Sequence, residues 1–479
     1  MMAIMDVASG ATQRITAQYG KKVRRDVIRQ EITRNAPVTI TGERYRAGFA
    51  LDDIMPQENS GKTYYIAGHG SGHKMEGVLS PVYIHALWLD CGGDEGILWL
   101  SADIVGLTNV EVERIRAKIS GSKIIKGCRS VNVSCTHSHS GIDTVGYWGK
   151  PHLSIPSDGK DPAYMDQLFE KALRTAEAAY LTRRPGRLFM GQAPIPDGLY
   201  AKRPFTDRHE ILYRLRFHPD DNGREIHIIN VGAHPNSLGG SNRLLSGEYP
   251  YYMREEIYRQ TGAQVFFGVG AIGGMDAADL DGKDPVDTIK RQGKLFAEAS
   301  LSIREERELA PRIRFLRRQF YLPVDNNVLA FLAILGTMSF RPFPDDTSKT
   351  GIAMKTEMTY LTFGDQKILL LPGESFIATV YGGYRSAAES ATGKGPEVNA
   401  PPLAELAKDP DLVVFGVTND MTGYSVEPNE FILHLTQPYL NTTRDRFNER
   451  HYHETNSMGP QTQPIIAKTF AEVLEDFGE

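Results

Sequence analysis

The stretch Ser130-Val131-Asn132-Val133-Ser134-Cys135-Thr136-His137-Ser138-His139-Ser140-Gly141 joins a strand-like run to a turn that carries two histidines. Side chains at positions i and i+2 of a strand lie on the same face, so the pattern predicts that His137 and His139 reach one spot. Neutral imidazole is the commonest protein ligand of zinc. The stretch therefore indicates a metal site where a buried strand ends, although isolated histidine pairs also occur in ordinary cores and surfaces.

The segments before this stretch predict an α/β layer. Residues 81–90 and 96–105 are apolar enough to form buried strands, and residues 91–94 supply the turn between them. Thr108 is a suitable N-cap for a helix, which would precede the strand that carries the histidines. Strand, helix and strand in this order are typical of the α/β class.

Composition excludes several classes of protein. The chain has 479 residues, of which 41% are hydrophobic and 24% charged, with a net charge of −5. This mild acidity argues against a nucleic-acid partner, and no apolar stretch is long enough to predict a transmembrane segment. Three scattered cysteines and the absence of a recognisable signal sequence favour a cytoplasmic protein. The sequence allows an oligomer.

Three further residues that suit a metal site follow predicted strands. His234 follows the second strand of a predicted hairpin, Glu374 follows the strand 367–371, and Tyr424 follows the strand 413–417. Ligands of open α/β sheets bind outside the carboxyl ends of the strands, so these loops are expected to converge. Each residue also has a purely structural interpretation: His234 can cap a strand, Glu374 can stabilise the start of a helix, and Tyr424 can be a half-buried aromatic.

In its motifs the chain resembles the neutral/alkaline ceramidase family. The resemblance rests on blocks that occur in the same order from about residue 45 to residue 475. They are Ala47 to Pro56, Ser101 to Gly106, Thr136 to Gly141 (T-H-x-H-S-G in the family), Ala233-His234-Pro235-Asn236-Ser237 with Ser246-Gly247-Glu248, Leu371-Pro372-Gly373-Glu374, and Asn419 to Tyr424 with Pro428-Asn429-Glu430.

The resemblance implies a fold. We expect a single large catalytic domain over residues 45–479, with mixed β-sheets flanked by helices. Residues 1–44 would form an N-terminal helical extension. The family's C-terminal immunoglobulin-like domain is expected to be lacking.

The resemblance also implies a site with one zinc ion per chain. Carried over by position, the zinc ligands would be His137, His234, Glu374 and Tyr424. His139 would face the substrate or the zinc-bound water and transfer a proton. Tyr452 corresponds best to a second family tyrosine that would donate to the developing oxyanion, and an insertion at 436–450 precedes it.

The chain departs from the family in the expected substrate pocket. Gly273, in Gly270-Ala271-Ile272-Gly273-Gly274-Met275-Asp276, stands where the family has a serine that contacts the scissile amide. His69 and His73 lie in a polar loop that is unusual for a lipid-binding site. Together with Asp276, these residues are our candidates for substrate binding.

Three interpretations of function follow. The first is a zinc-dependent amidohydrolase that cleaves an N-acyl bond of a lipid, with an apolar groove to which Phe331, Leu332, Leu335 and Met338 would contribute. The same run can equally form an ordinary core helix. The second interpretation is a zinc enzyme of this scaffold that acts on a soluble polar substrate, such as a carbohydrate or small amide. The third is a zinc-binding module without catalytic activity.

Overall fold

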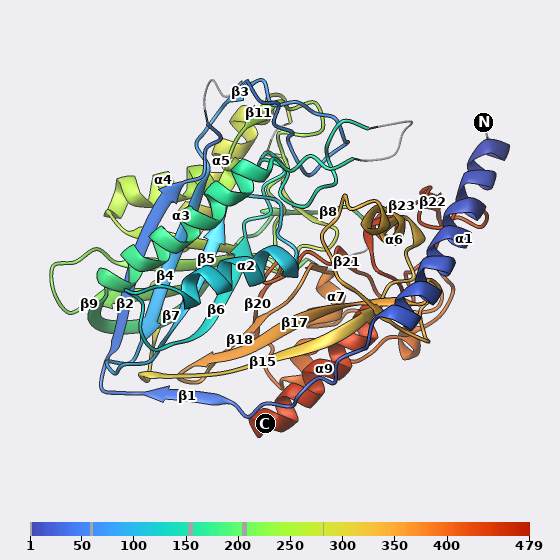
Figure 1. The fold of residues 1–479 in the computed structure, drawn as a ribbon. Coiled ribbons are helices and arrows are strands. Elements are labelled where there is room, and N and C mark those ends of the chain that lie inside the picture. Colours follow the sequence, from blue (N-terminus) through green and yellow to red (C-terminus); the bar gives the residue numbers. More distant parts are fainter. Residues whose placement is uncertain (1, 58–60, 152–156, 204–207, 281) are drawn as a thin grey trace.

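Two mixed β-sheets pack face to face in the computed structural model, which describes residues 2–57, 61–151, 157–203, 208–280 and 282–479 (Figure 1). The larger sheet has the strand order β12-β10-β9-β7-β2-β4-β5-β6, with β14 paired to β7. The smaller sheet has the order β1-β15-β17-β18-β20, with β16 paired to β17. In the described residues β5–β6, β10–β12 and β18–β20 are parallel, so both sheets are mixed as expected.

The strands of the larger sheet are β2 (Tyr45–Asp53), β4 (Tyr83–Asp90), β5 (Gly96–Ala102), β6 (Cys128–Cys135), β7 (Arg184–Pro194), β9 (Ile211–Pro219), β10 (Ile226–Val231), β12 (Gln264–Val269) and β14 (Arg307–Leu309). Those of the smaller sheet are β1 (Val38–Thr41), β15 (Arg312–Pro323), β16 (Pro342–Pro344), β17 (Ile352–Phe363), β18 (Gln366–Leu370) and β20 (Val413–Phe415). Short two-stranded ladders pair β3 (Gly77–Val78) with β11 (Leu244–Leu245), β8 (Leu199–Ala201) with β13 (Met275–Ala277), β19 (Glu374–Ser375) with β21 (Tyr424–Ser425), and β22 (Thr443–Arg444) with β23 (Arg450–His451).

Helices cover the outer faces of both sheets (Figure 1). Helix α3 (Pro162–Leu181) packs on β2 and β4, α2 (Asn109–Ser120) packs on α3, and α4 (Glu248–Thr261) and α5 (Pro285–Ser302) pack on each other and on further strands of the larger sheet. Helix α9 (Thr462–Phe477) covers the smaller sheet, where Phe470 and Phe477 contact Tyr360. The remaining helices of the described residues are α1 (Met2–Asp26), α6 (Asn327–Ile334), α7 (Ile377–Tyr381) and α8 (Leu403–Leu406), with two short 3₁₀ helices, η1 (Pro396–Val398) and η2 (His453–Asn456). No described helix is both long and apolar enough to cross a membrane.

The inner faces of the two sheets form one apolar core. Trp99 of β5 contacts Phe266 of β12 and Phe415 of β20, with ring centroids 5.2 and 4.6 Å apart. Its indole N–H donates to Ser134 Oγ at 2.8 Å, so this buried polar group is paired. Successive side chains along a strand point to opposite faces of its sheet, so the other apolar side chains of these strands lie on the outer faces. There they pack against the helices in a second apolar cluster.

Several sequence predictions need correction at their boundaries. Residues 1–44 were expected to form a helical extension, but the helix spans Met2–Asp26 and Val38–Thr41 join the smaller sheet as β1. Helix α5 ends at Ser302, and Arg307–Leu309 then form β14 along the edge of β7. Thr108 is the N-cap of α2, but its hydroxyl bonds to the Glu111 side chain and not to a backbone N–H.

The contact between the sheets at Gly268 leads to a stability prediction. A Cβ atom on Gly268 would lie 2.6 Å from Cδ1 of the buried Phe415 ring, so Gly268→Ala should lower the free energy of unfolding by about 1–3 kcal/mol. Gly93→Ala is the matched control, because a Cβ there meets no atom within 4 Å, and its effect should stay within about 0.5 kcal/mol. Denaturant unfolding of both variants measures this difference, and equal stabilities would contradict the packing described.

Candidate metal centre and cavity

The carboxyl ends of strands from both sheets meet at one place. Asn230 of β10 donates through Nδ2 to Gly268 O and to Val414 O, both at 3.0 Å, and so joins the larger sheet to β20 of the smaller one. The hydroxyls of Ser134 and Thr418 are 2.8 Å apart and join β6 to the segment after β20. The loops that follow these strands therefore start side by side, as expected for ligand sites of α/β sheets.

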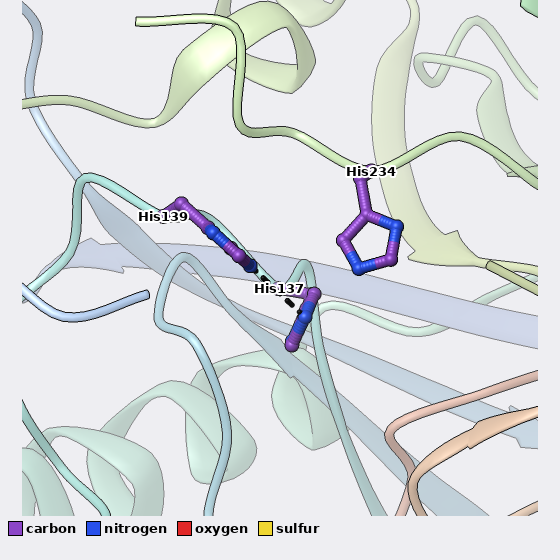
Figure 2. Close-up of side chains that lie close together, drawn as sticks. All are labelled: His137, His139 and His234. Atoms are coloured by element: carbon purple, nitrogen blue, oxygen red, sulfur yellow. Dashed lines mark hydrogen bonds between the residues drawn. The ribbon is translucent and has the colours of Figure 1, made fainter. Parts of the chain in front are cut away.

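His137 and His139 converge, but not by the strand alternation that the sequence suggested. Strand β6 ends at Cys135, and His137 has a φ of 61°, a left-handed conformation that non-glycine residues rarely adopt. The two Nε2 atoms nevertheless lie 3.2 Å apart, and Figure 2 shows both rings beside His234. A strained backbone turn, rather than the period of a strand, thus brings the pair together.

Backbone carbonyls fix the tautomers of two of these histidines. His137 Nδ1 lies 2.6 Å from Val105 O, and His234 Nδ1 lies 2.9 Å from Met275 O. Because a carbonyl oxygen only accepts, both Nδ1 atoms must carry the proton, and the neutral rings keep their Nε2 lone pairs. Carbonyl partners of this kind orient many metal-binding histidines.

The carboxylate of Glu374 faces these lone pairs. Its Oε2 atom lies 2.8 Å from His234 Nε2 and 3.5 Å from His137 Nε2, and all three side chains are buried. Although burial opposes ionisation, the two imidazoles hold the pKa of Glu374 well below its usual range. Burial opposes protonation of His234, but the carboxylate raises its pKa. Two acceptors at this distance need a proton or a cation between them.

Tyr424 stands next to Glu374 because their backbones pair. The short parallel ladder of β19 and β21 places Glu374 directly opposite Tyr424. The Tyr424 ring lies 6.5 Å from the His234 ring, centroid to centroid. Burial, with the Glu374 carboxylate, raises the pKa of Tyr424 well above its usual value. The structure therefore brings together all four residues that the resemblance named as zinc ligands.

The donor set fits a transition-metal ion. Tetrahedral zinc with bonds of about 2.0–2.1 Å has neighbouring ligand atoms about 3.3 Å apart, close to the 2.8 and 3.5 Å found around Glu374 Oε2. A second ligand set overlaps the first, since one nitrogen from each of His137, His139 and His234 lies within 4.8 Å of the others. His139 was expected to contact substrate or water and not the metal. His137 and His234 belong to both sets.

The cluster lies in the wall of a cavity of about 680 Å³. One part of the wall is polar: Asp276 forms an ion pair with Lys202, accepts from Asn236 Nδ2 at 3.0 Å, and adjoins His69. The other part is mainly apolar. It contains Val105, Val145, Tyr147, Trp148, Leu329, Met338, Met421 and Met458.

The structure places some of the predicted substrate-binding residues in this wall and others outside it. His69 and Asp276 line the cavity, as does Tyr452. His73 is half-buried nearby and is not one of the lining residues. Gly273 also lies behind the wall, where it forms a bridge with Phe376, and Gly274 lines the cavity in its place.

Sequence reasoning missed Lys202, Asn236 and Trp148 as lining residues, and His453 behind them. Asn236 stands two positions after His234 in a block that had been singled out, so its place could have been inferred. Trp148 and Lys202 come from long loops without a motif, and no sequence signal identified them.

Comparison with known proteins shows similarity of fold. The neutral ceramidase from Pseudomonas aeruginosa matches with a TM-score of 0.65 and 16% sequence identity over 90% of this chain and 74% of that one. A structure described as ceramidase complexed with C2 matches with a TM-score of 0.62, 16% identity, and 89% and 74% coverage. The fold is thus ceramidase-like. No protein-family model and no curated protein matches the sequence.

The geometry predicts the effect of single histidine substitutions on metal content. The protein purified with zinc should carry one ion per chain, and His137→Ala and His234→Ala should each lose it while keeping their circular dichroism, because each removes a nitrogen that faces Glu374. His218→Ala is the control, since that half-exposed histidine bonds to Glu225 on the larger sheet. Elemental analysis decides, and zinc retained in both site variants would exclude this metal centre.

Proposed function

We propose that this protein is a zinc-dependent hydrolase that uses water to cleave an N-acyl amide bond. One observation carries the proposal: Glu374 Oε2 lies 2.8 Å from His234 Nε2 and 3.5 Å from His137 Nε2, beside a cavity that can admit a substrate. The ceramidase-like fold supports an amide as the bond that is cleaved. At this low identity the fold does not by itself assign an activity.

His137, His234, Glu374 and Tyr424 would hold the ion. A divalent ion bound there supplies a water of lowered pKa and polarises the carbonyl of the substrate. The backbone carbonyls of Val105 and Met275 keep the two imidazoles in the tautomer that such binding requires. The protein thus prepares the donor atoms before any ligand arrives.

Proton transfer falls to His139. His139 Nε2 lies 3.2 Å from His137 Nε2, the nitrogen that would bind the ion. The other ring nitrogen of His139, Nδ1, is buried and has no hydrogen-bond partner among the described residues. His139 lines the cavity, so we assign to it the removal of a proton from the attacking water and its transfer to the leaving amine.

Tyr452 is placed to stabilise the developing negative charge. It lines the cavity, and its ring lies 6.4 Å from that of Tyr424, centroid to centroid. Burial raises the pKa of its hydroxyl, so the group stays protonated and can donate a hydrogen bond to an oxyanion. This donation would contribute mainly in the transition state.

The apolar part of the wall would accommodate the acyl group. The run 328–338 contributes to it only in part: Leu329 and Met338 line the cavity, whereas Phe331 and Leu332 do not and Leu335 is 53% exposed. The run is therefore both a helix packed against the core, as α6, and one edge of the cavity.

The polar part of the wall supports the second interpretation, a soluble polar substrate. Asp276 and Lys202 lie beside the histidine cluster, with the carboxylate Oδ1 3.9 Å from His234 Nδ1. Such groups could bind hydroxyl or amide groups of a substrate. The range of amides that the protein hydrolyses distinguishes this interpretation from the first.

The role of His139 predicts a separation of metal binding from turnover. His139→Ala should keep its zinc, because His137, His234, Glu374 and Tyr424 remain, but should lose about 10²–10⁴-fold in kcat. Zinc analysis together with initial rates on an N-acyl amide measures both properties. Loss of zinc in this variant would instead assign His139 to the ligand set.

The apolar wall predicts a dependence on acyl length. Met338→Ala should lower kcat/KM about tenfold for a long-chain N-acyl amide and leave a short acetyl amide nearly unchanged, because only the long chain reaches that wall. Leu335→Ala is the matched control from the same run, where the side chain is exposed. Activity confined to short polar amides, with no effect of Met338→Ala, would favour the second interpretation.

A further inference from the structure

The buried imidazole of His453 contacts the rings of two residues to which the proposed function assigns roles. It stacks on Tyr452 with centroids 3.9 Å apart and an angle of 29° between the rings. It meets Tyr424 edge to face at 4.7 Å and 90°. Phe376 packs on a third side at 5.0 Å. His453 is fully buried, so these rings and not solvent define its surroundings.

A charged anchor fixes His453. Arg203 Nη2 donates to His453 Nδ1 at 3.2 Å and to Glu454 Oε1 at 2.8 Å, and the guanidinium lies over the Phe376 ring at 5.0 Å. Because arginine only donates, His453 Nδ1 must accept, and the proton of the neutral ring lies on Nε2. The neighbouring His451 Nδ1 also bonds to Glu454 Oε1, at 2.8 Å. The ring therefore has one tautomer and one orientation.

Gly274, which has no side chain, brings the cavity close to this ring. Gly274 lines the cavity, has a φ of 70°, and would place a Cβ 3.7 Å from His453 Nε2 and 2.9 Å from Phe376 Cε1. The ring contacts thus occur directly behind the cavity wall, on the side where Tyr424 and Tyr452 face it.

We propose that His453, anchored by Arg203, is a positioning residue that sets the orientation of Tyr424 and Tyr452 at the metal centre. The inference rests on the proposed function, since it concerns how these two tyrosines reach the metal and the substrate. A rotated Tyr452 would stabilise the transition state less without weakening substrate binding. A displaced Tyr424 would weaken metal binding, as the loss of outer partners of metal ligands generally does.

Two substitutions of His453 test the contributions of its ring and of its hydrogen bond to Arg203 separately. His453→Gln keeps an acceptor for Arg203 but loses the ring, so kcat should fall about 10–100-fold, with KM within about threefold, and the affinity for Co²⁺ should fall about tenfold. His453→Phe keeps a ring of similar shape but removes the acceptor for Arg203, so its kcat and Co²⁺ affinity should fall clearly less than those of His453→Gln. His451→Gln alters the same Glu454 network, while Tyr424 and Tyr452 keep their contacts with the His453 ring, and it should match the wild type within about threefold.

Steady-state rates on an N-acyl amide and Co²⁺ titration of the metal-free protein provide two separate measurements. Wild-type values in His453→Gln, or equal losses in His453→Gln, His453→Phe and His451→Gln, would overturn the positioning role. If the wild type binds Co²⁺ but cleaves no amide, the proposed function fails, and the Co²⁺ affinities of the variants alone decide the inference. A wild type that binds no Co²⁺ would overturn both.

Discussion

The contact between His234 and Glu374 ties the two sheets together at the place where the cavity forms. His234 follows β10 of the larger sheet, and Glu374 follows β18 of the smaller one. Burying an unpaired carboxylate costs several kcal/mol, so the approach of its Oε2 to 2.8 Å from His234 Nε2 needs a compensating charge. Asn230, which bonds to carbonyls of β12 and β20, holds the strand ends at the separation that this contact requires.

Backbone strain accompanies this contact. His137, Val417 and Asn419 all have positive φ values, and Val417 is β-branched, for which such a value is exceptional. Each of these residues lies just after a strand that leads to the site. Strain of this kind costs about 1–3 kcal/mol per residue and persists where the surrounding structure over-determines it. These loops therefore adopt strained conformations that bring the donor atoms together, and not the conformations of lowest local energy.

The strand ends and the residues that follow them could be predicted from the sequence, because apolar runs that stop at polar turns are a local signal. His137, His234, Glu374 and Tyr424 were found in this way and by family resemblance, and the structure brings them together. The convergence of His137 and His139 was predicted for the wrong reason. The alternation of side chains along a strand does not apply to His137, whose backbone is left-handed and lies beyond the end of β6. The division of strands into two sheets depends on long-range pairing and was not predictable either.

Prediction was weakest for residues of the cavity wall. Side chains in loops follow no regular period, so their orientation cannot be predicted from the spacing of residues. We predicted His69, His73, Gly273 and Asp276 as substrate-binding residues on equal grounds, and only His69 and Asp276 line the cavity. The domain boundary at residue 45 remains a prediction, and the segment before it contributes β1 as well as α1.

The glycine at position 273 has a packing explanation that changes how the substrate should be inferred. The resemblance suggested a lost serine, but a Cβ on Gly273 would lie 2.6 Å from Phe376 Cδ2 and 2.7 Å from Phe376 N. A serine therefore cannot fit unless Phe376 moves, and Phe376 is held by the Arg203 guanidinium and by the His453 and Tyr424 rings. Phe376 thus occupies the space that a serine side chain at position 273 would need, so the glycine leaves no empty volume there. Under the proposed function, substrate preference would then depend on side chains that do line the cavity, among them the apolar residues and the Lys202–Asp276 pair.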